Sequence, residues 1–321
     1  MRSNASRELV RQCLTRFEEI AKPGEIGDIT FGTLNEYVNA RLKMRGRNPG
    51  STTAAATIRK ELRTVHAALS FALKSLFVSA IPVFPKVDGF ETTKRFVTPE
   101  HLDAMLGACH VAKFPDRIGF LAEHWWDAML TLLWFAPNRI KSVLCLRWED
   151  VDLDGGIVIS KARNVKQKRT HKAHINDVVV ERLQRIRPAE VPIHDPDKLR
   201  SSLVFPWPRS KKSLYSQFFA IQTAAGIKLT CDGEHEHTDA CQFYGFDDFR
   251  RSVATLNDLK NLPTSFIQNQ MGHSTYATTQ RYIKQHDEHG KCVAQLASTP
   301  GLSRRQAISA GVQGACSAQA K

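Results

Sequence analysis

Apolar residues recur every three or four positions between Thr53 and Val78, and this spacing most restricts how the N-terminal part of the chain can fold. The residues of this stripe are Ile58, Leu62, Val65, Leu69, Leu73 and Leu76. Such a period places apolar side chains on one face of an α-helix. Basic residues lie elsewhere around the helix, and they are interpreted either as solvated surface or as contacts to a phosphate backbone. We expect the region from Arg7 to Ser79 to be helical.

A cluster of helix-breaking residues follows this helix. The sequence Ile-Pro-Val-Phe-Pro occupies residues 81–85 and continues into Lys-Val-Asp-Gly. Proline and glycine clusters of this kind are typical of linkers. We therefore predict one domain at residues 1–92, a second at 93–290, and a C-terminal tail at 291–321. At 321 residues the chain is long enough for each domain to bury its own core.

The second domain is expected to be mainly helical with a small antiparallel sheet. A helix start is predicted at Thr98, with a proline at the first helical position. A Trp-rich helix is expected to break at 136–138, and a further helix then ends near Trp148. Turn-forming residues at 152–156 lead into a β-rich run, and residues 161–175 are predicted to form further strands.

The charge balance favours a polyanionic partner. The chain has 45 Lys and Arg against 32 Asp and Glu, a net charge of +13, and nucleic acid is a commoner partner for such chains than an anionic membrane surface. No apolar run is long enough for a membrane-spanning helix, and the N-terminus lacks the apolar core of a signal peptide. Seven scattered cysteines fit a reducing compartment better than a disulfide framework. We therefore expect a cytoplasmic, nucleoid-associated protein.

Three segments, in order, resemble the conserved boxes of the tyrosine recombinase (phage integrase) family. FAPNRIKSVLCLRWEDVDLDGGIVIS resembles the first box, GFDDFRRSVAT the second, and MGHSTYATTQRY the last. The resemblance spans Thr98 to Gln285. It implies an N-terminal helical core-binding domain and a catalytic domain that together clamp double-stranded DNA. It also implies a homotetramer on two DNA sites, with the C-terminal tail packing on a neighbouring protomer.

The same resemblance assigns roles to individual residues. Arg139 and Arg250 match the family's two catalytic arginines, His273 its late His/Trp position, and Tyr282 its nucleophile. Asp247 stands where the second box usually has histidine. A carboxylate there repels a phosphate unless it is protonated or paired with an arginine, although it can also act as a base or orient an arginine.

The family's lysine lies on a β-hairpin, eight residues before a position that usually holds proline. His174 takes that position here, which points to Lys166 as the general acid. Lys161 and Lys168 remain alternatives.

The chemistry explains why these residue types occur together. Attack by tyrosine on a phosphodiester gathers negative charge on the non-bridging oxygens, which two arginines can bind bidentately. A lysine can protonate the departing 5′ oxygen. The 3′-phosphotyrosyl product keeps the energy of the broken bond, so we expect no ATP, cofactor or catalytic metal. A topoisomerase-like nicking and closing enzyme, and a DNA-binding protein weakened by Asp247, are the alternative functions.

An insertion ahead of the second box carries four metal-ligand residue types within a short stretch. They are Cys231, His235, His237 and Cys241. Two cysteines and two histidines suit a tetrahedral zinc ion of structural type. A polar loop with two free thiols is the equally weighted interpretation.

Overall fold

A computed structural model describes residues 4–46, 49–89, 95–116, 120–162, 170–188, 202–231 and 236–283. The chain divides into two compact units: unit 1 comprises residues 1–93 and 230–242, and unit 2 comprises 94–229 and 243–321. The sequence analysis assigned residues 230–242 to the second domain, but they group with unit 1. One contact that joins them to it is a hydrogen bond of 3.1 Å from the Glu236 amide to the Pro49 carbonyl. The predicted tail at 291–321 lies outside the described residues.

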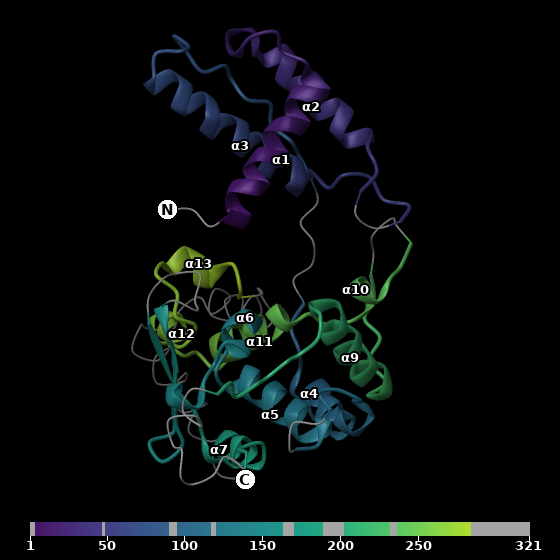
Figure 1. The fold of residues 1–321 in the computed structure, drawn as a ribbon, viewed down its shortest axis with the longest axis vertical. Helices are drawn as coiled ribbons and strands as arrows, with labels where there is room; N and C mark the ends of the chain where they lie inside the picture. The colour runs from purple at the N-terminus through teal and green to yellow at the C-terminus, as the bar shows by residue number, and fades with distance from the viewer. Residues whose placement is uncertain are drawn as a thin grey trace, which may run out of the picture. The chain divides into compact units, whose positions relative to one another are not determined.

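Three helices form most of the described part of unit 1. These are α1 (Asn4–Ala21), α2 (Phe31–Lys43) and α3 (Ala55–Lys74), and α1 packs against both α2 and α3 (Figure 1). The predicted apolar stripe forms the centre of this packing. Its buried core consists of Phe17, Leu34, Tyr37, Val38, Ile58, Leu62, Val65, Leu69 and Val87.

The third helix is shorter than its apolar period predicts. It ends at Lys74, and Leu76, predicted to belong to the stripe, has a φ of +61° and is 90% exposed. The amide of Phe77 donates to the Ala72 carbonyl at 2.9 Å. A left-handed residue with this hydrogen bond is a common way for a helix to end, so the local cap overrides the periodicity.

A buried carboxylate joins the three helices of unit 1. Glu61 on α3 accepts hydrogen bonds from Arg41, Tyr37 and Arg16, and the two to Arg41 are both 2.9 Å long. Burial alone would raise the pKa of Glu61, but its hydrogen bonds from Arg41 and Tyr37 outweigh that effect and lower it. The ion pair is therefore fully compensated inside the helix bundle.

Helix α5 (Ala122–Phe135) is the central helix of unit 2. It packs against α7 (Asp177–Arg185), α11 (Phe246–Leu259) and α4 (Pro99–Gly107) (Figure 1). Trp125 and Trp126 on α5 are completely buried. Thr98 caps α4 by accepting a hydrogen bond from the His101 amide, which confirms the predicted helix start. The remaining helices are α6 (Ile140–Leu144), α9 (Lys211–Ala224), α12 (Thr264–Gln270) and α13 (Tyr276–Gln280), with α10 (Asp239–Gln242) in unit 1.

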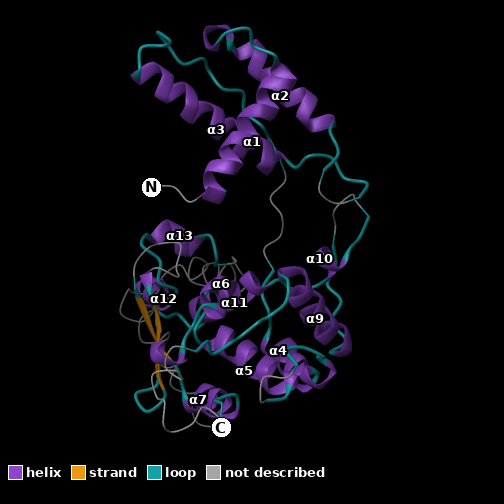
Figure 2. Ribbon diagram, in the orientation of Figure 1, coloured by secondary structure: helices purple, strands orange, loops and turns teal. Residues whose placement is uncertain are grey.

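Unit 2 also carries a small sheet. Strands β1 (Val151–Asp152), β2 (Ile157–Ser160) and β3 (His171–His174) pair antiparallel in the order β1-β2-β3 (Figure 2). Gly156 takes a φ of +61° in the turn between the first two, as turn-forming residues predict. The fold is thus mainly helical with a small antiparallel sheet, as predicted. Among the described helices, none is both long enough and apolar enough to cross a membrane.

Candidate active site

Arg139 lies where the chain leaves the buried helix α5 and begins α6. It is the N-cap residue of α6 and has extended backbone angles. The preceding Asn138 is buried and accepts a hydrogen bond of 3.1 Å from Ser160 on β2. This bond ties the start of α6 to the sheet. Arg139 itself is half-buried, and its positive charge lowers the pKa values of Arg250 and His273, so the predicted catalytic cations lie close together.

Arg250 on α11 is buried, with 2% of its surface exposed. Its guanidinium donates to the carbonyl of Pro137 and, at 3.2 Å, to that of Met271. Its Nε is buried and has no hydrogen-bond partner among the described residues. Burial is the main cause that lowers the pKa of Arg250. Backbone carbonyls therefore fix this guanidinium while one of its donors stays unused.

His273 is held between Arg250 and helix α13. Its Nε2 lies 2.9 Å from Arg250 Nη2 and its Nδ1 lies 3.0 Å from Thr279 Oγ1. An arginine nitrogen can only donate, so Nε2 is the acceptor and the ring proton is on Nδ1, facing Thr279. Burial, together with the charges of Arg250 and Arg139, lowers the pKa of His273 to about 4. The ring is neutral near pH 7.

Tyr282 follows α13 and packs over these two residues. Its ring centroid lies 5.0 Å from that of His273, and the Arg250 guanidinium carbon lies 5.5 Å from the ring centroid. The amide of Tyr282 donates to the Thr279 carbonyl at 2.9 Å. Thr279 therefore binds His273 through its side chain and Tyr282 through its backbone. The structure brings together Arg250, His273 and Tyr282, of which the first and last are 32 positions apart in the chain.

His171 on β3 is a neighbour that the sequence analysis missed. Its Nε2 lies 2.9 Å from the carbonyl oxygen of Gln270, and its ring packs against Gly272, where a Cβ atom would lie only 3.0 Å from ring Cγ. Gly272 has a φ of +64°. Burial is the main cause that lowers the pKa of His171. A histidine in a basic strand gives no sign in the sequence that it will pack against the turn before His273. The glycine before His273 is nevertheless consistent with a tight contact there.

Asp247 and Asp248 lie in the first turn of α11 and have different surroundings. Asp248 is buried and accepts from the Gly245 amide at 2.8 Å and from Arg251 at 2.6 Å. Burial is the main cause that raises its pKa. Asp247 is exposed and makes no hydrogen bond or ion pair with another described residue, but its charge acts on Arg250. Of the two adjacent arginines, Arg250 lies against His273 and Tyr282, and Arg251 pairs with Asp248.

Of the three candidate lysines, Lys161 is the one that lies within the described residues. Lys161 directly follows β2 and forms ion pairs with Glu149 and, at 2.6 Å, with Asp150. These carboxylates raise its pKa. Lys166 and Lys168 lie outside the described residues. Lys161 therefore already has carboxylate partners, which is unfavourable for a lysine that must approach a phosphate.

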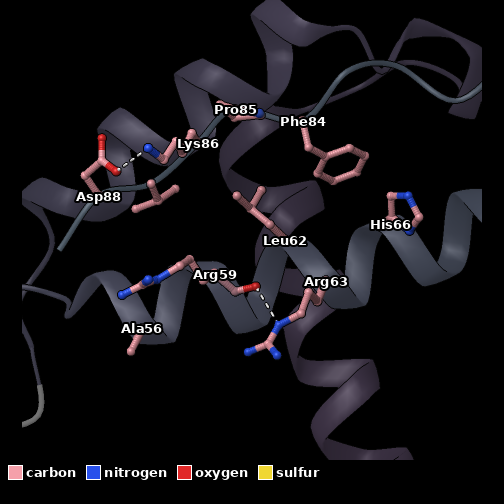
Figure 3. Close-up of a pocket in the computed structure, with 10 residues that line it drawn as sticks. Ala56, Arg59, Leu62, Arg63, His66, Phe84, Pro85, Lys86 and Asp88 are labelled. Atoms are coloured by element: carbon pink, nitrogen blue, oxygen red, sulfur yellow. Dashed lines mark hydrogen bonds and ion pairs between the residues drawn. The ribbon is translucent and has the colours of Figure 1, made fainter. Parts of the chain in front are cut away.

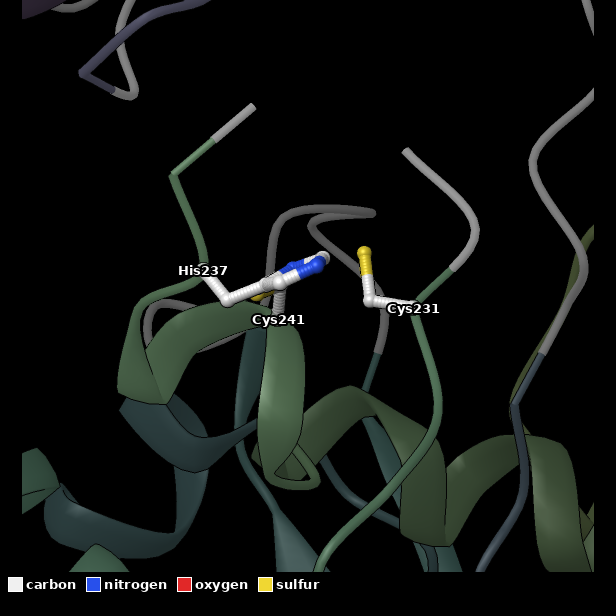
Figure 4. Close-up of side chains that lie close together, drawn as sticks. All are labelled: Cys231, His237 and Cys241. Carbon is white, nitrogen blue, oxygen red and sulfur yellow. The ribbon is translucent and has the colours of Figure 1, made fainter. Parts of the chain in front are cut away.

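Three of the four predicted metal ligands lie together. The ligand atoms of Cys231, His237 and Cys241 are all within 4.8 Å of one another (Figure 4). None of these residues belongs to unit 2, where the candidate catalytic residues are. His235 lies outside the described residues.

Unit 1 carries a basic groove along α3. Arg59, Arg63 and His66 project from the helix, and residues 84–88 run beside them (Figure 3). His66 packs edge-on against Phe84, with ring centroids 5.1 Å apart. Lys86 adds a further cation and pairs with Asp88 at 3.4 Å. Exposed cations on one groove are suited to contact a phosphate backbone.

The chain resembles known proteins in its sequence and its fold. The model of the phage integrase family matches residues 95–289. The integrase of transposon Tn1549, solved with circular intermediate DNA, is 17% identical with a TM-score of 0.63, over 88% of this chain and 91% of that chain.

Two further solved structures are similar. The XerH recombinase on a palindromic difH substrate is 15% identical with a TM-score of 0.64, over 89% of this chain and 78% of that one. A lambda integrase dimer on a COC′ core site is 14% identical with a TM-score of 0.60, over 88% and 73%. These likenesses show a shared fold. No curated protein sequence matches this chain.

Proposed function

The chain belongs to the phage integrase family of tyrosine recombinases, and we propose that Tyr282 is the nucleophile with which this site-specific recombinase cuts and rejoins DNA. The observation that carries the proposal is the cluster of Tyr282, His273 and Arg250. A tyrosine ring lies over a neutral histidine and a buried guanidinium, which is the environment that an attack on a phosphate requires.

The reaction is a transesterification. The Tyr282 oxygen attacks phosphorus and forms a phosphotyrosyl bond, the bond from phosphorus to the 5′ oxygen breaks, and that oxygen takes a proton. Arg139 and Arg250 bind the non-bridging oxygens. The unused Nε donor of Arg250 supports this role, since a buried donor without a partner is costly until a ligand accepts from it.

We propose one group for each of the two proton transfers. We assign protonation of the 5′ oxygen to Lys166, because Lys161 is paired with two carboxylates. We assign acceptance of the Tyr282 proton to Asp247, whose exposed carboxylate has no ion-pair partner among the described residues. His273 positions Arg250 and, through Thr279, the segment that ends in Tyr282.

The nucleophile and the phosphate-binding groups come from one chain. Tyr282 packs on Arg250 and His273 of its own protomer, so we propose that each protomer cleaves with its own tyrosine. Religation reverses the same step with a different 5′ hydroxyl. Because the phosphotyrosyl bond conserves the bond energy, the proposed reaction consumes no nucleotide and needs no cofactor.

DNA binding is proposed to use both units. The groove of Arg59, Arg63 and Lys86 in unit 1 supplies sequence-independent phosphate contacts, and the net charge of +13 supports this. We propose that the working form is a tetramer on two DNA sites, as strand exchange between two duplexes requires, and that it acts in the reducing cytoplasm.

The proposal is tested with a nicked suicide substrate that traps the covalent adduct. Tyr282→Phe removes only the phenolic oxygen, so the adduct on a denaturing gel should vanish while DNA affinity stays nearly unchanged. Tyr276→Phe is the matched control, because Tyr276 is 58% exposed and only accepts a hydrogen bond from Gln280. An adduct that persists in Tyr282→Phe and disappears in Tyr276→Phe would reassign the nucleophile.

A further inference from the structure

We propose that Cys231, His237 and Cys241 bind a structural zinc ion in unit 1. Two sulfur atoms and one imidazole nitrogen converge within 4.8 Å of one another. Figure 4 shows the His237 ring extending toward Cys231, with Cys241 next to His237 on the segment at α10. None of the three is part of the chemistry assigned to Tyr282.

The separation between Cys241 and His237 matches what zinc requires. With Zn–S near 2.3 Å and Zn–N near 2.0–2.1 Å, tetrahedral angles put a ligand sulfur and a ligand nitrogen about 3.5 Å apart. Cys241 Sγ and His237 Nδ1 are 3.6 Å apart. Cys231 Sγ lies within 4.8 Å of the other two ligand atoms. A small movement of this sulfur brings all three ligand atoms to zinc-binding distances. The fourth position is open to water or to a further protein ligand.

Thr238 contacts the Cys241 sulfur through both of its backbone groups. The Thr238 amide donates to Cys241 Sγ at 3.2 Å, and the thiol donates to the Thr238 carbonyl at 3.1 Å. When a metal replaces the thiol proton, the amide N–H stays directed at the sulfur and stabilises its negative form. Cys241 is 9% exposed, so the sulfur is sheltered from oxidants. Zinc binding replaces the thiol protons of both cysteines, which releases two protons, and affinity falls as the pH is lowered.

The ion's role follows from where the chain enters and leaves the site. Cys231 and Cys241 lie at the two ends of an insertion whose middle bonds to another part of unit 1, through Glu236 and Pro49. Gly50 has a φ of +71° and also lies close to Glu236. A Cβ atom added to Gly50 would be 3.6 Å from Glu236 Cγ. Closing the insertion with a metal restricts its conformations, and so holds Glu236 against Pro49.

Metal content of the full-length protein tests the site directly. After zinc reconstitution and desalting, mass spectrometry of the metal should find about one zinc per chain. Cys231→Ser and Cys241→Ser should lose it, and Cys145→Ser, outside the cluster, should retain it. Zinc that stays stoichiometric in the Cys231→Ser, Cys241→Ser double variant, or a folded parent protein that binds none, would overturn the proposal.

A second measurement needs no variant. Cobalt(II) in the parent protein should give the visible bands of tetrahedral coordination with thiolate charge transfer, and X-ray absorption should count two sulfur ligands. Removing the metal with a chelator should increase hydrogen exchange at the Glu236 amide and leave the α5 amides unchanged. Octahedral cobalt with only oxygen and nitrogen ligands would contradict the assignment.

Discussion

Single side chains of unit 2 set the charge at the proposed phosphate site. Arg250 is fixed by two carbonyls, Arg139 lies close enough to lower its pKa, and His273, bonded to Arg250, stays neutral. A neutral histidine avoids a third positive charge beside two guanidiniums while still accepting a hydrogen bond. Cationic charge is thereby concentrated on groups that cannot lose their protons at physiological pH.

Lowering the pH should destabilise the protein through His273. Its pKa is about 4 in the folded protein against an ordinary 6.5. Between these values the unfolded chain binds more protons, and this binding stabilises the unfolded state. The unfolding free energy should be fully retained above pH 6.5 and fall by on the order of 2 kcal/mol by pH 4. Urea unfolding across this range should show a flatter profile for His273→Gln, whereas the exposed His174→Gln should keep the slope. Equal slopes in all three proteins would contradict the assignment.

The lysines can be separated with a leaving-group test. Lys166→Ala should slow strand cleavage about 10²-fold or more, as loss of a general acid does, and a substrate with sulfur in place of the 5′ bridging oxygen should restore the rate. Lys161→Ala should show no such rescue, since Lys161 pairs with Glu149 and Asp150, and Lys168→Ala controls for a neighbouring charge. Rescue confined to Lys161→Ala would transfer the role to Lys161.

At the scale of elements, the turn between α12 and α13 positions the histidine. Gly272 is left-handed and packs on the His171 ring of β3, and the next residue is His273. The sheet and the nucleophile segment therefore meet at a residue without a side chain. A β-carbon here would both strain the backbone and push the strand away.

Gly272→Ala is expected to lower the unfolding free energy by about 1–3 kcal/mol, from the left-handed backbone and the 3.0 Å contact with His171. Cleavage should slow as well, because His273 moves with the turn. Thermal unfolding and adduct formation measure the two effects. Gly107→Ala is the control: nothing lies within 4 Å of the position that its Cβ would take, so it should be neutral or stabilising. An unchanged Gly272→Ala would show that the turn adapts freely.

Elements and their ends were predictable where capping or turn-forming residues mark them, and ends were not predictable from apolar periodicity alone. Thr98-Pro99 predicts the start of α4 correctly, and the glycines at 155–156 predict the turn between strands. The period through Leu76 fails, because periodicity carries no information about a left-handed cap. Among site residues, the resemblance brought Arg250, His273 and Tyr282 together, but the roles of His171 and Thr279 depend on contacts between distant segments, which no spacing reveals.

At the scale of the whole molecule, the two units have separate cores. Buried residues of unit 1 cluster around Leu34 and Ile58, and those of unit 2 around Trp125 and Trp126. All five tryptophans lie at positions 125, 126, 134, 148 and 207, within unit 2. Tryptophan fluorescence therefore reports on unit 2, whereas far-ultraviolet circular dichroism reports on both.

Glu61→Ala should lower the stability of unit 1 by about 3–5 kcal/mol, because it leaves Arg41 buried without its partner. In urea, circular dichroism should show an earlier transition while the tryptophan transition stays in place. Glu36→Ala, at an exposed position of α2, should change neither. A shift of both signals together in Glu61→Ala would mean that the units unfold as one.

Because residues 230–242 belong to unit 1, recombination between related genes cannot exchange the two units with one crossover. Unit 1 is encoded by two stretches of the gene, and most of unit 2 is encoded between them. A single crossover in the linker, which would swap whole domains in a protein built in series, separates Glu236 from Pro49 and leaves each hybrid with a mismatched pair. Keeping both units intact takes three junctions, after residues 93, 229 and 242. Lineages of this chain should therefore inherit the insertion and the N-terminal helices together.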